Sequence, residues 1–392
     1  MNQAAHLSGN FLKAKAREIT GIDVDDQEAD AALTVLCNAY RHDSNLHASG
    51  TVAISNYLLR LLSNRLRMQR DFINHPEIAE EEITSPVFLW GMPRTGSTKA
   101  QKLLAASGDF NFLTFWESHN PALYTSDRGE SPESRIRDTD EFAQWFREAS
   151  PGTLHTHPLQ THEPEEETFI LMHSLRTPCF IAFSDTTSYL QWLATQDMTA
   201  QFAYLKDTLK YLQWQGLASA AKPWLLKSPV SYGMESAVLS VFPDAKLVMT
   251  HRDPREVIPS FCSTIKSYYT PFTDAPINYE TKIGQLVWAL NLHLAARSAA
   301  NKPEILDVNY AELVNSVEGV VEKIYAFAGL PLTPSSRSAI VDWNQRDLKN
   351  GKAAHKYLLK DFSVSEKMIA EQFADYDALL RHLFGNPTEI PR

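Results

Sequence analysis

Cysteine is scarce in this sequence of 392 residues, and long apolar runs are absent. Cys37, Cys179 and Cys262 are odd in number and far apart, which argues against a disulfide framework and for a reducing compartment. No stretch approaches the roughly 18 apolar residues that span a bilayer. The first residues lack a basic segment followed by an apolar core, so we expect no signal peptide. These absences predict a cytoplasmic protein without a transmembrane segment.

Positive charge is not in excess either. The formal net charge of −10 at pH 7 disfavours nucleic acid or another polyanion as a partner. It does not disfavour a small anionic cofactor, because basic residues gather locally. They are Arg94, Lys99 and Lys102, and further on Lys227, Arg252 and Arg255. With 44% hydrophobic and 21% charged residues, the composition is that of an ordinary globular protein.

The most informative stretch, residues 86–98, reads Pro-Val-Phe-Leu-Trp-Gly-Met-Pro-Arg-Thr-Gly-Ser-Thr. A β-favouring run ends at Gly91, a loop follows, and a helical pattern begins beyond it. This succession of strand, glycine loop and helix N-terminus is the arrangement that cradles phosphates. Gly91 and Gly96 have the spacing of the Walker A loop, but Ser97 occupies the position of its lysine. The positive charge lies at Arg94 instead, which predicts an anion site that differs from an ATP site.

A second stretch completes the pattern. Residues 223–229 read Pro-Trp-Leu-Leu-Lys-Ser-Pro, residues 251–254 read His-Arg-Asp-Pro, and Ser260 follows Arg252 by eight positions. Together the two stretches resemble the phosphate-binding motifs of the sulfotransferases, and the layout is similar to the bacterial branch that includes the tyrosylprotein sulfotransferases. The resemblance covers residues 85–362. It implies 3′-phosphoadenosine 5′-phosphosulfate (PAPS) as the sulfuryl donor, and the sulfuryl transfer that it implies requires no metal.

The resemblance also implies roles for single residues. Arg94 and the loop would hold the 5′-phosphosulfate, and Lys227 would stabilise the leaving phosphate. Arg252 and Ser260 would hold the 3′-phosphate. The implied cofactor-binding residues of the two motifs are thus Arg94, Thr95, Gly96, Ser97, Thr98, Arg252 and Ser260. The alternatives are a purely structural strand–helix turn and, for Lys227, an ordinary surface position. His251 and Arg255 are further candidates, of which we expect at least one to be structural.

The catalytic base is the harder assignment. Cytosolic sulfotransferases have a histidine two residues beyond the lysine, where this chain has Pro229. The tyrosylprotein sulfotransferases use a glutamate downstream of the loop arginine, and Glu117 has that placement. An apolar setting beside Phe115 and Trp116 would raise the pKa of the Glu117 carboxyl and make it a better base. The alternative is a salt-bridged structural carboxylate.

Alternating strand and helix patterns predict an α/β fold, with a P-loop-like parallel sheet flanked by helices, an N-terminal helical extension and a helical insertion. The expected strands are 86–90, 223–227, 246–250 and 305–309, and residues 109–117 are expected to be extended. We expect a helical segment at 1–84 and a sulfotransferase-like domain at 85–392. A mostly helical insertion at 120–222 is the predicted acceptor side. Both motifs follow predicted strands, at whose carboxyl ends such folds bind ligands.

One N-terminal helix is predicted from leucines at helical spacing, and His75-Pro76 ends it. Its arginines at positions 60, 65, 67 and 70 favour a solvated basic face. The alternative is that one of them reaches the cofactor or a partner subunit.

Two polar segments leave their roles open. Residues 350–357, which include Lys352, loosely resemble the loop that closes over the 3′-phosphate in sulfotransferases, and a surface loop fits equally well. The second segment contains His155, His157, His162, Glu163, Glu165, Glu166 and Glu167. A metal site, contacts with the acceptor and a solvated loop are all compatible with it, although the spacing lacks a clean set of metal ligands.

We therefore predict a PAPS-dependent sulfotransferase that acts on a hydroxyl of a small or lipid-like acceptor. The reaction would be an in-line displacement with Arg94, Lys227 and the general base Glu117 as catalytic residues. An ATP-dependent P-loop-type kinase and a non-catalytic nucleotide-binding protein are the alternatives. The identity of the acceptor and the oligomeric state stay open.

Overall fold

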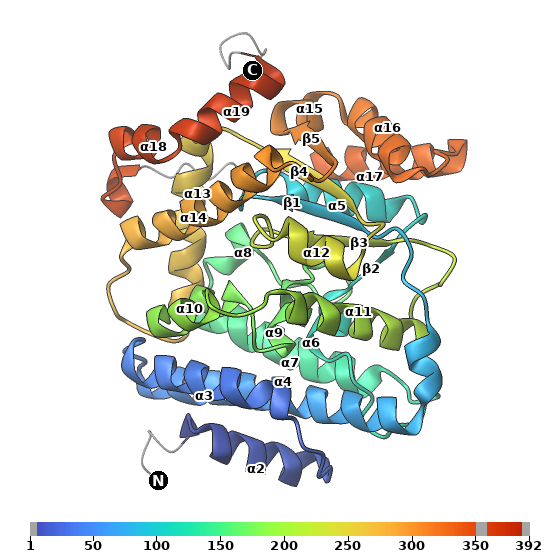
Figure 1. The fold of residues 1–392 in the computed structure, drawn as a ribbon, viewed down its shortest axis with the longest axis vertical. Helices are drawn as coiled ribbons and strands as arrows, with labels where there is room; N and C mark the ends of the chain where they lie inside the picture. The colour runs from blue at the N-terminus through green and yellow to red at the C-terminus, as the bar shows by residue number, and fades with distance from the viewer. Residues whose placement is uncertain (1–5, 350–358, 386–392) are drawn as a thin grey trace. The chain divides into compact units, whose positions relative to one another are not determined.

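The structure is a computed structural model that describes residues 6–349 and 359–385, without the side chains of residues 155 and 156. The chain forms two compact units (Figure 1), which we describe separately. The helical unit comprises Met1–Glu82, Thr114–Ala220 and Thr264–Ile277. The sheet unit comprises Ile83–Leu113, Ala221–Ser263 and Asn278–Arg392. The predicted division at residues 84 and 85 stays a prediction.

The helical unit is built from α-helices and two short 3-10 helices. Their bounds are α2 Gly9–Thr20, α3 Gln27–His42, α4 Ala48–Asn74, η1 Pro76–Glu80, α6 Phe115–His119, α7 Glu133–Ala149, α8 Thr153–Thr156, α9 Thr168–His173, η2 Pro178–Ala182, α10 Thr187–Leu193 and α11 Thr199–Trp214. Helix α4 ends before His75-Pro76, as predicted, because the proline cannot continue it. Within the described ranges of the chain, no helix is both long and apolar enough to cross a membrane.

The predicted solvated basic face of α4 is wrong. Arg65 is 3% exposed, and its Nε and Nη2 donate hydrogen bonds of 2.5 and 2.7 Å to the carboxylate of Asp26. The guanidinium of Arg60 lies 4.5 Å from the ring centroid of Tyr57. Because α4 packs against α2, α9 and η1, neighbours cover it on more than one side. A helical repeat read from one segment cannot reveal this.

The sheet unit contains every strand named in the described chain. Its elements are β1 Val87–Gly91, α5 Ser97–Ala106, β2 Asn111–Phe112, β3 Trp224–Ser228, α12 Glu235–Val241, β4 Lys246–His251, α13 Pro254–Tyr269 as far as Ser263, α14 Tyr279–Ser298, β5 Ile305–Asn309, α15 Tyr310–Asn315, α16 Val317–Ala328, α17 Pro334–Lys349, η3 Leu359–Phe362, α18 Glu366–Gln372 and α19 Ala374–Phe384. The strand order is β2-β3-β1-β4-β5 with all neighbours parallel. This confirms the predicted α/β fold.

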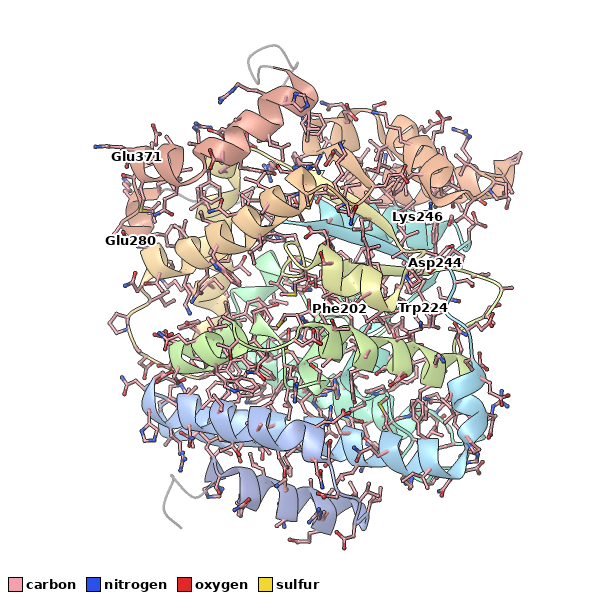
Figure 2. All side chains as sticks on the ribbon, in the orientation of Figure 1. Phe202, Trp224, Asp244, Lys246, Glu280 and Glu371 are labelled. Atoms are coloured by element: carbon pink, nitrogen blue, oxygen red, sulfur yellow. The ribbon has the colours of Figure 1, made fainter. Side chains whose placement is uncertain are left out.

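Side chains of β1 alternate between two packed faces of the sheet. Val87 and Leu89 join a core with α5, α16 and α17, whereas Phe88 packs against Phe242 at 5.5 Å on the opposite side. Asp244, which precedes β4 and is labelled in Figure 2, accepts a 2.6 Å hydrogen bond from the backbone N–H of Ser85 before β1. Burial on both faces explains why β1 is a continuous apolar run.

The predicted extended segment 109–117 is wrong over its second half. Strand β2 covers only Asn111–Phe112, and Phe115–His119 forms helix α6. Thr114 Oγ1 accepts from the Glu117 N–H, and the Glu117 carboxylate accepts from the Thr114 N–H, which forms a capping box. The capping residues outweigh the β propensity of the aromatic neighbours.

Candidate functional site

The loop after β1 has an unusual backbone. Arg94 has φ of 72°, a conformation that residues other than glycine rarely adopt. Gly96 has φ of 92°, and an added Cβ would lie 2.9 Å from the side chains of Leu313 and Tyr310. At Gly91 an added Cβ would lie 2.3 Å from Thr250 Oγ1. The two glycines therefore permit both the turn and its close packing.

Hydroxyl groups fasten this loop to the neighbouring strand. Thr95 Oγ1 donates a 2.7 Å hydrogen bond to the carbonyl of Met92 and lies 2.7 Å from Thr250 Oγ1 on β4. Thr250 Oγ1 in turn donates to the carbonyl of Trp90 at 3.1 Å. Thr95 is fully buried, so its side chain shapes the loop, and its backbone N–H is the part that suits a ligand.

Helix α5 begins directly after the loop, with an N-terminus suited to an anion. Gly96 is its N-cap, no side-chain oxygen caps it, and its first turn contains no acidic residue. The first N–H groups of a helix have no partner within the helix and carry a partial positive charge. Ser97 is buried and Thr98 is exposed, so Thr98 presents the more accessible hydroxyl.

The two sequence motifs meet in the sheet unit. Arg94 Nε donates a 2.9 Å hydrogen bond to Ser260 Oγ on α13. Arg252, directly after β4, donates from Nη1 to the carbonyl oxygen of Arg94 at 3.2 Å. After β1 the chain goes to one side of the sheet, toward β2, whereas after β4 it goes to the other side, toward β5. The loops after β1 and β4 therefore lie at the topological switch point, where such sheets bind ligands. Two arginines and a serine hydroxyl gathered there can bind an anion with several oxygens.

Two residues that sequence reasoning missed orient Arg252. Glu256 Oε2 accepts from Arg252 Nε at 2.9 Å and lies 2.8 Å from its Nη2. The ring centroid of Tyr310 lies 4.0 Å from the guanidinium carbon. The i, i+4 spacing of Arg252 and Glu256 was a usable sequence pattern. Tyr310 directly follows β5 at the ligand-binding edge of the sheet, but its position in the sequence does not indicate that it stacks on Arg252.

Lys227 is the fourth residue of β3 and pairs in register with Leu89 of β1. It is 2% exposed, so the surface alternative is wrong. The strands are parallel, which places the ends of β3, β1 and β4 at one edge of the sheet. His251 is also fully buried, between Tyr376 and Asp307, and Arg255 pairs with Asp253 and Asp377.

Glu117 lies in the helical unit, and it is 8% exposed. Thr114 donates to its Oε2 from the backbone at 2.8 Å and from Oγ1 at 2.7 Å. Burial raises the pKa of Glu117 above its usual 4.5, while the Thr114 hydrogen bonds and the more distant Arg135 and His162 counteract part of the rise. Within the described residues, the carboxylate accepts these bonds on Oε2 alone. The group is thus both a structural cap and a carboxylate with a raised pKa.

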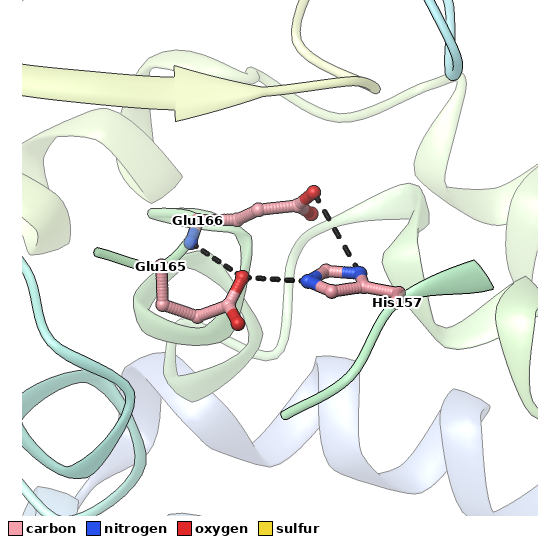
Figure 3. A group of neighbouring side chains, drawn as sticks. All are labelled: His157, Glu165 and Glu166. Carbon is pink, nitrogen blue, oxygen red and sulfur yellow. Dashed lines mark hydrogen bonds and ion pairs between the residues drawn. The ribbon is translucent and has the colours of Figure 1, made fainter. Parts of the chain in front are cut away.

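The histidine-rich segment forms a polar cluster in the helical unit (Figure 3). His157 Nε2 lies 2.8 Å from Glu165 Oε1, and Nδ1 lies 3.9 Å from Glu166 Oε1. The hydroxyl of Tyr268 lies 2.9 Å from the same Nδ1. The potential ligand atoms lie within 4.8 Å of one another, but the two carboxylates approach opposite ring nitrogens. A single ion binds only one nitrogen of a ring, so the arrangement is that of a hydrogen-bonded histidine.

The roles expected of Lys352 and His155 stay predictions. Lys352 and the loop 350–357 lie outside the described residues, as does the side chain of His155. His162 is exposed. Among the aromatic residues of the insertion, Phe146, Phe169, Tyr189 and Trp214 are buried and form part of the core.

Comparison with known proteins identifies the family. A family model described as the sulfotransferase family matches residues 86–334, which include both motifs. The chain belongs to the sulfotransferase family. It is 24% identical over 298 residues to the omega-hydroxy-beta-dihydromenaquinone-9 sulfotransferase Stf3 of Mycobacterium tuberculosis and to that of Mycobacterium bovis. The match covers 72% of this chain and 73% of each relative.

Solved structures agree with this sulfotransferase assignment. Sulfotransferase STF1 from Mycobacterium tuberculosis superimposes with a TM-score of 0.77 at 26% identity, covering 93% of this chain and 98% of that one. Sulfotransferase STF9 from Mycobacterium avium has the same fold, with a TM-score of 0.81 at 22% identity and 97% of both chains covered. The predicted family and enzyme class are confirmed, and the kinase and non-catalytic alternatives lose their support.

Proposed function

We propose that this sulfotransferase moves a sulfuryl group from PAPS to a hydroxyl of a small or lipid-like acceptor by in-line displacement. The observation that carries the proposal is the convergence of Arg94, Arg252 and Ser260 at the carboxyl edge of the sheet. These groups suit a donor with phosphate at both the 5′ and the 3′ position. The carboxylate in contact with Arg252, Glu256, is more than half exposed, so water screens its competition with a phosphate.

Roles in the donor site follow from chemistry and position. The N–H groups at the start of α5 and the Arg94 guanidinium would hold the 5′-phosphosulfate. Arg252 offers a planar fork that suits phosphate, and Ser260 would add a hydroxyl bond on the 3′ side. Lys227 would balance the negative charge that develops on the leaving phosphate. Lys352 would add a cation to the 3′ side.

The chemical step balances without a metal ion. The acceptor oxygen forms a bond to sulfur as the bond between sulfur and the bridging phosphate oxygen breaks, and 3′,5′-ADP leaves. The acceptor proton passes to Glu117. The raised pKa of this buried carboxyl favours proton uptake, and the transfer would accompany the attack of the oxygen.

The acceptor class rests on two observations. Stf3, a sequence relative, is named for an omega-hydroxy dihydromenaquinone, a lipid that carries a hydroxyl. The aromatic rings of Tyr57, Phe115 and Phe142 pack against one another in the helical unit, and Phe115 belongs to α6, the helix that carries Glu117. We propose the cytoplasm as the location, because all three cysteines are unpaired and buried.

Release of 3′,5′-ADP from PAPS tests the proposed reaction. The acceptors are an isoprenoid quinone with a terminal hydroxyl, a phenol and a tyrosine-containing peptide, each beside an analogue in which the hydroxyl is methylated. We expect 3′,5′-ADP to be released with the lipid acceptor at least, and with no methylated analogue. Arg94→Met should slow it by about 10²-fold or more, as loss of a positioned donor does. Phosphoryl transfer from ATP-Mg without any turnover of PAPS would contradict the proposal.

A further inference from the structure

Helix α19 contacts the segment that carries Arg252. The hydroxyl of Tyr376 lies 2.9 Å from His251 Nδ1, and the two rings stack at 27° with centroids 5.7 Å apart. Both side chains are fully buried. The Tyr376 hydroxyl thus contacts the last residue of β4, directly before Arg252.

The direction of each hydrogen bond is set by a carboxylate. Asp307 Oδ1 lies 2.8 Å from His251 Nε2, and Arg297 donates to both Asp307 oxygens at 2.8 and 2.7 Å. Asp307 can only accept, so the His251 proton lies on Nε2. Burial lowers the pKa of His251 below its usual 6.5, so near pH 7 the ring is neutral and Nδ1 is an acceptor. Tyr376 therefore donates its hydroxyl proton to His251 Nδ1.

The next residue of α19 holds the other end of the same turn. Asp377 Oδ2 lies 3.0 Å from Arg255 Nη2, and Arg255 Nη1 donates to Asp253 Oδ1 at 3.0 Å. Arg255 is largely exposed, and such pairs contribute little. The buried hydroxyl of Tyr376 is therefore the stronger of the two links.

We propose that Tyr376 of α19 is a positioning residue for the 3′-phosphate of the donor, acting on Arg252 through its neighbour His251. This inference rests on the proposed function. The direction of the chain at Arg252 decides where its guanidinium lies, here against the carbonyl of Arg94 and over the ring of Tyr310. Without the Tyr376 hydroxyl, the buried His251 Nδ1 loses its hydrogen-bond donor. The turn that begins at the next residue, Arg252, then shifts to satisfy this nitrogen, and the guanidinium moves with it.

The affinity ratio of 3′,5′-ADP to 5′-AMP tests the inference by calorimetric titration, because the two ligands differ only in the 3′-phosphate. Tyr376→Phe removes the hydroxyl and keeps the ring. We expect it to lower the affinity for 3′,5′-ADP by about tenfold or more, as loss of the partner behind a binding group typically does. The affinity for 5′-AMP should stay nearly unchanged. The matched control is Tyr325→Phe, which removes another buried tyrosine hydroxyl of the sheet unit. That hydroxyl donates to Asp109 at 2.7 Å, and its loss should leave the ratio unchanged.

The possible outcomes separate the inference from the proposed function. If the unaltered enzyme does not prefer 3′,5′-ADP, the proposed donor site is wrong. If it does prefer 3′,5′-ADP, but Tyr376→Phe leaves the affinity ratio unchanged or lowers both affinities equally, the positioning role is wrong. Should Tyr376→Phe fail to fold, Asp307→Asn decides the matter, because it removes the carboxylate that holds the His251 proton on Nε2. The affinity ratio should fall severalfold, and an unchanged ratio overturns the inference.

Discussion

Arg94 Nε donates a 2.9 Å hydrogen bond to Ser260 Oγ, although 166 positions separate the two residues in the sequence. The arginine belongs to the loop after β1, and the serine belongs to the helix after β4. The bond joins the group proposed for the 5′-phosphosulfate to a group proposed for the 3′-phosphate. A bound donor would compete for both partners of this hydrogen bond.

Replacing Ser260 should weaken the 3′ side of the site. A hydrogen bond to a charged group contributes about 1.5–3 kcal/mol, so Ser260→Ala should weaken 3′,5′-ADP by about tenfold or more. The affinity for 5′-AMP should change little, which titration calorimetry can measure. Ser240→Ala is the control, because this exposed serine lies on α12 of the same unit. Equal weakening of both nucleotides would contradict the assignment.

Replacing Gly96 should damage the loop through crowding. Gly96→Ala adds a Cβ 2.9 Å from Leu313 and Tyr310, in addition to the strain of a positive φ. Gly108→Ala carries similar strain at φ of 76° but finds open space. Urea unfolding should show Gly96→Ala to be the less stable by about 1–3 kcal/mol, the usual cost of overpacking. Equal stability of the two variants would mean that the loop is not packed as described.

Replacing Glu117 by glutamine separates its two roles. A glutamine at this position of a capping box still accepts from the Thr114 N–H, so helix α6 should persist. A neutral amide cannot take the acceptor proton, and the rate of sulfuryl transfer should fall by about 10²–10⁴-fold. The affinity for 3′,5′-ADP should stay unchanged. A Glu117→Gln variant with near-normal transfer would leave Glu117 only its structural role.

The raised pKa of Glu117 makes a prediction about pH. Below its usual value of 4.5 the carboxyl is protonated in both the folded and the unfolded chain. As pH rises from there to the higher pKa of the folded state, only the unfolded chain loses the proton, so this group lowers the stability of the fold. The melting temperature of the unaltered protein should therefore fall relative to Glu117→Gln over that range. The rate of sulfuryl transfer should rise over the same range. If the melting temperatures of the two proteins change with pH in parallel, the pKa of Glu117 is not raised.

Much of the fold was predictable, because the relevant patterns are local. Strand β5 lies where it was expected, and α16 runs from Val317 to Ala328 and ends at Gly329 in the left-handed conformation. The loop around Arg94 was recognisable for the same reason. The capping box of Thr114 and Glu117 was also present in the sequence, but the aromatic residues between them suggested a strand.

The remaining features depend on distant partners. Arg65 looks like a surface residue until Asp26 is placed beside it by the packing of α4. Tyr310 contacts Arg252, and Tyr376 of a separate helix contacts the preceding His251; no spacing within either helix indicates these contacts. Tertiary packing brings such residues together, so the sequence of one segment does not reveal them.

Thermal unfolding with 3′,5′-ADP, 5′-ADP and ATP-Mg tests the central claim most directly. A ligand at about 100 times its dissociation constant adds about 2.7 kcal/mol to the free energy of unfolding, which is readily measured as a shift in Tm. A stabilising shift with 3′,5′-ADP and little or none with the other two is the predicted result. It would show that the site formed by Arg94, Arg252 and Ser260 requires a 3′-phosphate. Stabilisation by ATP-Mg without any by 3′,5′-ADP would contradict the account.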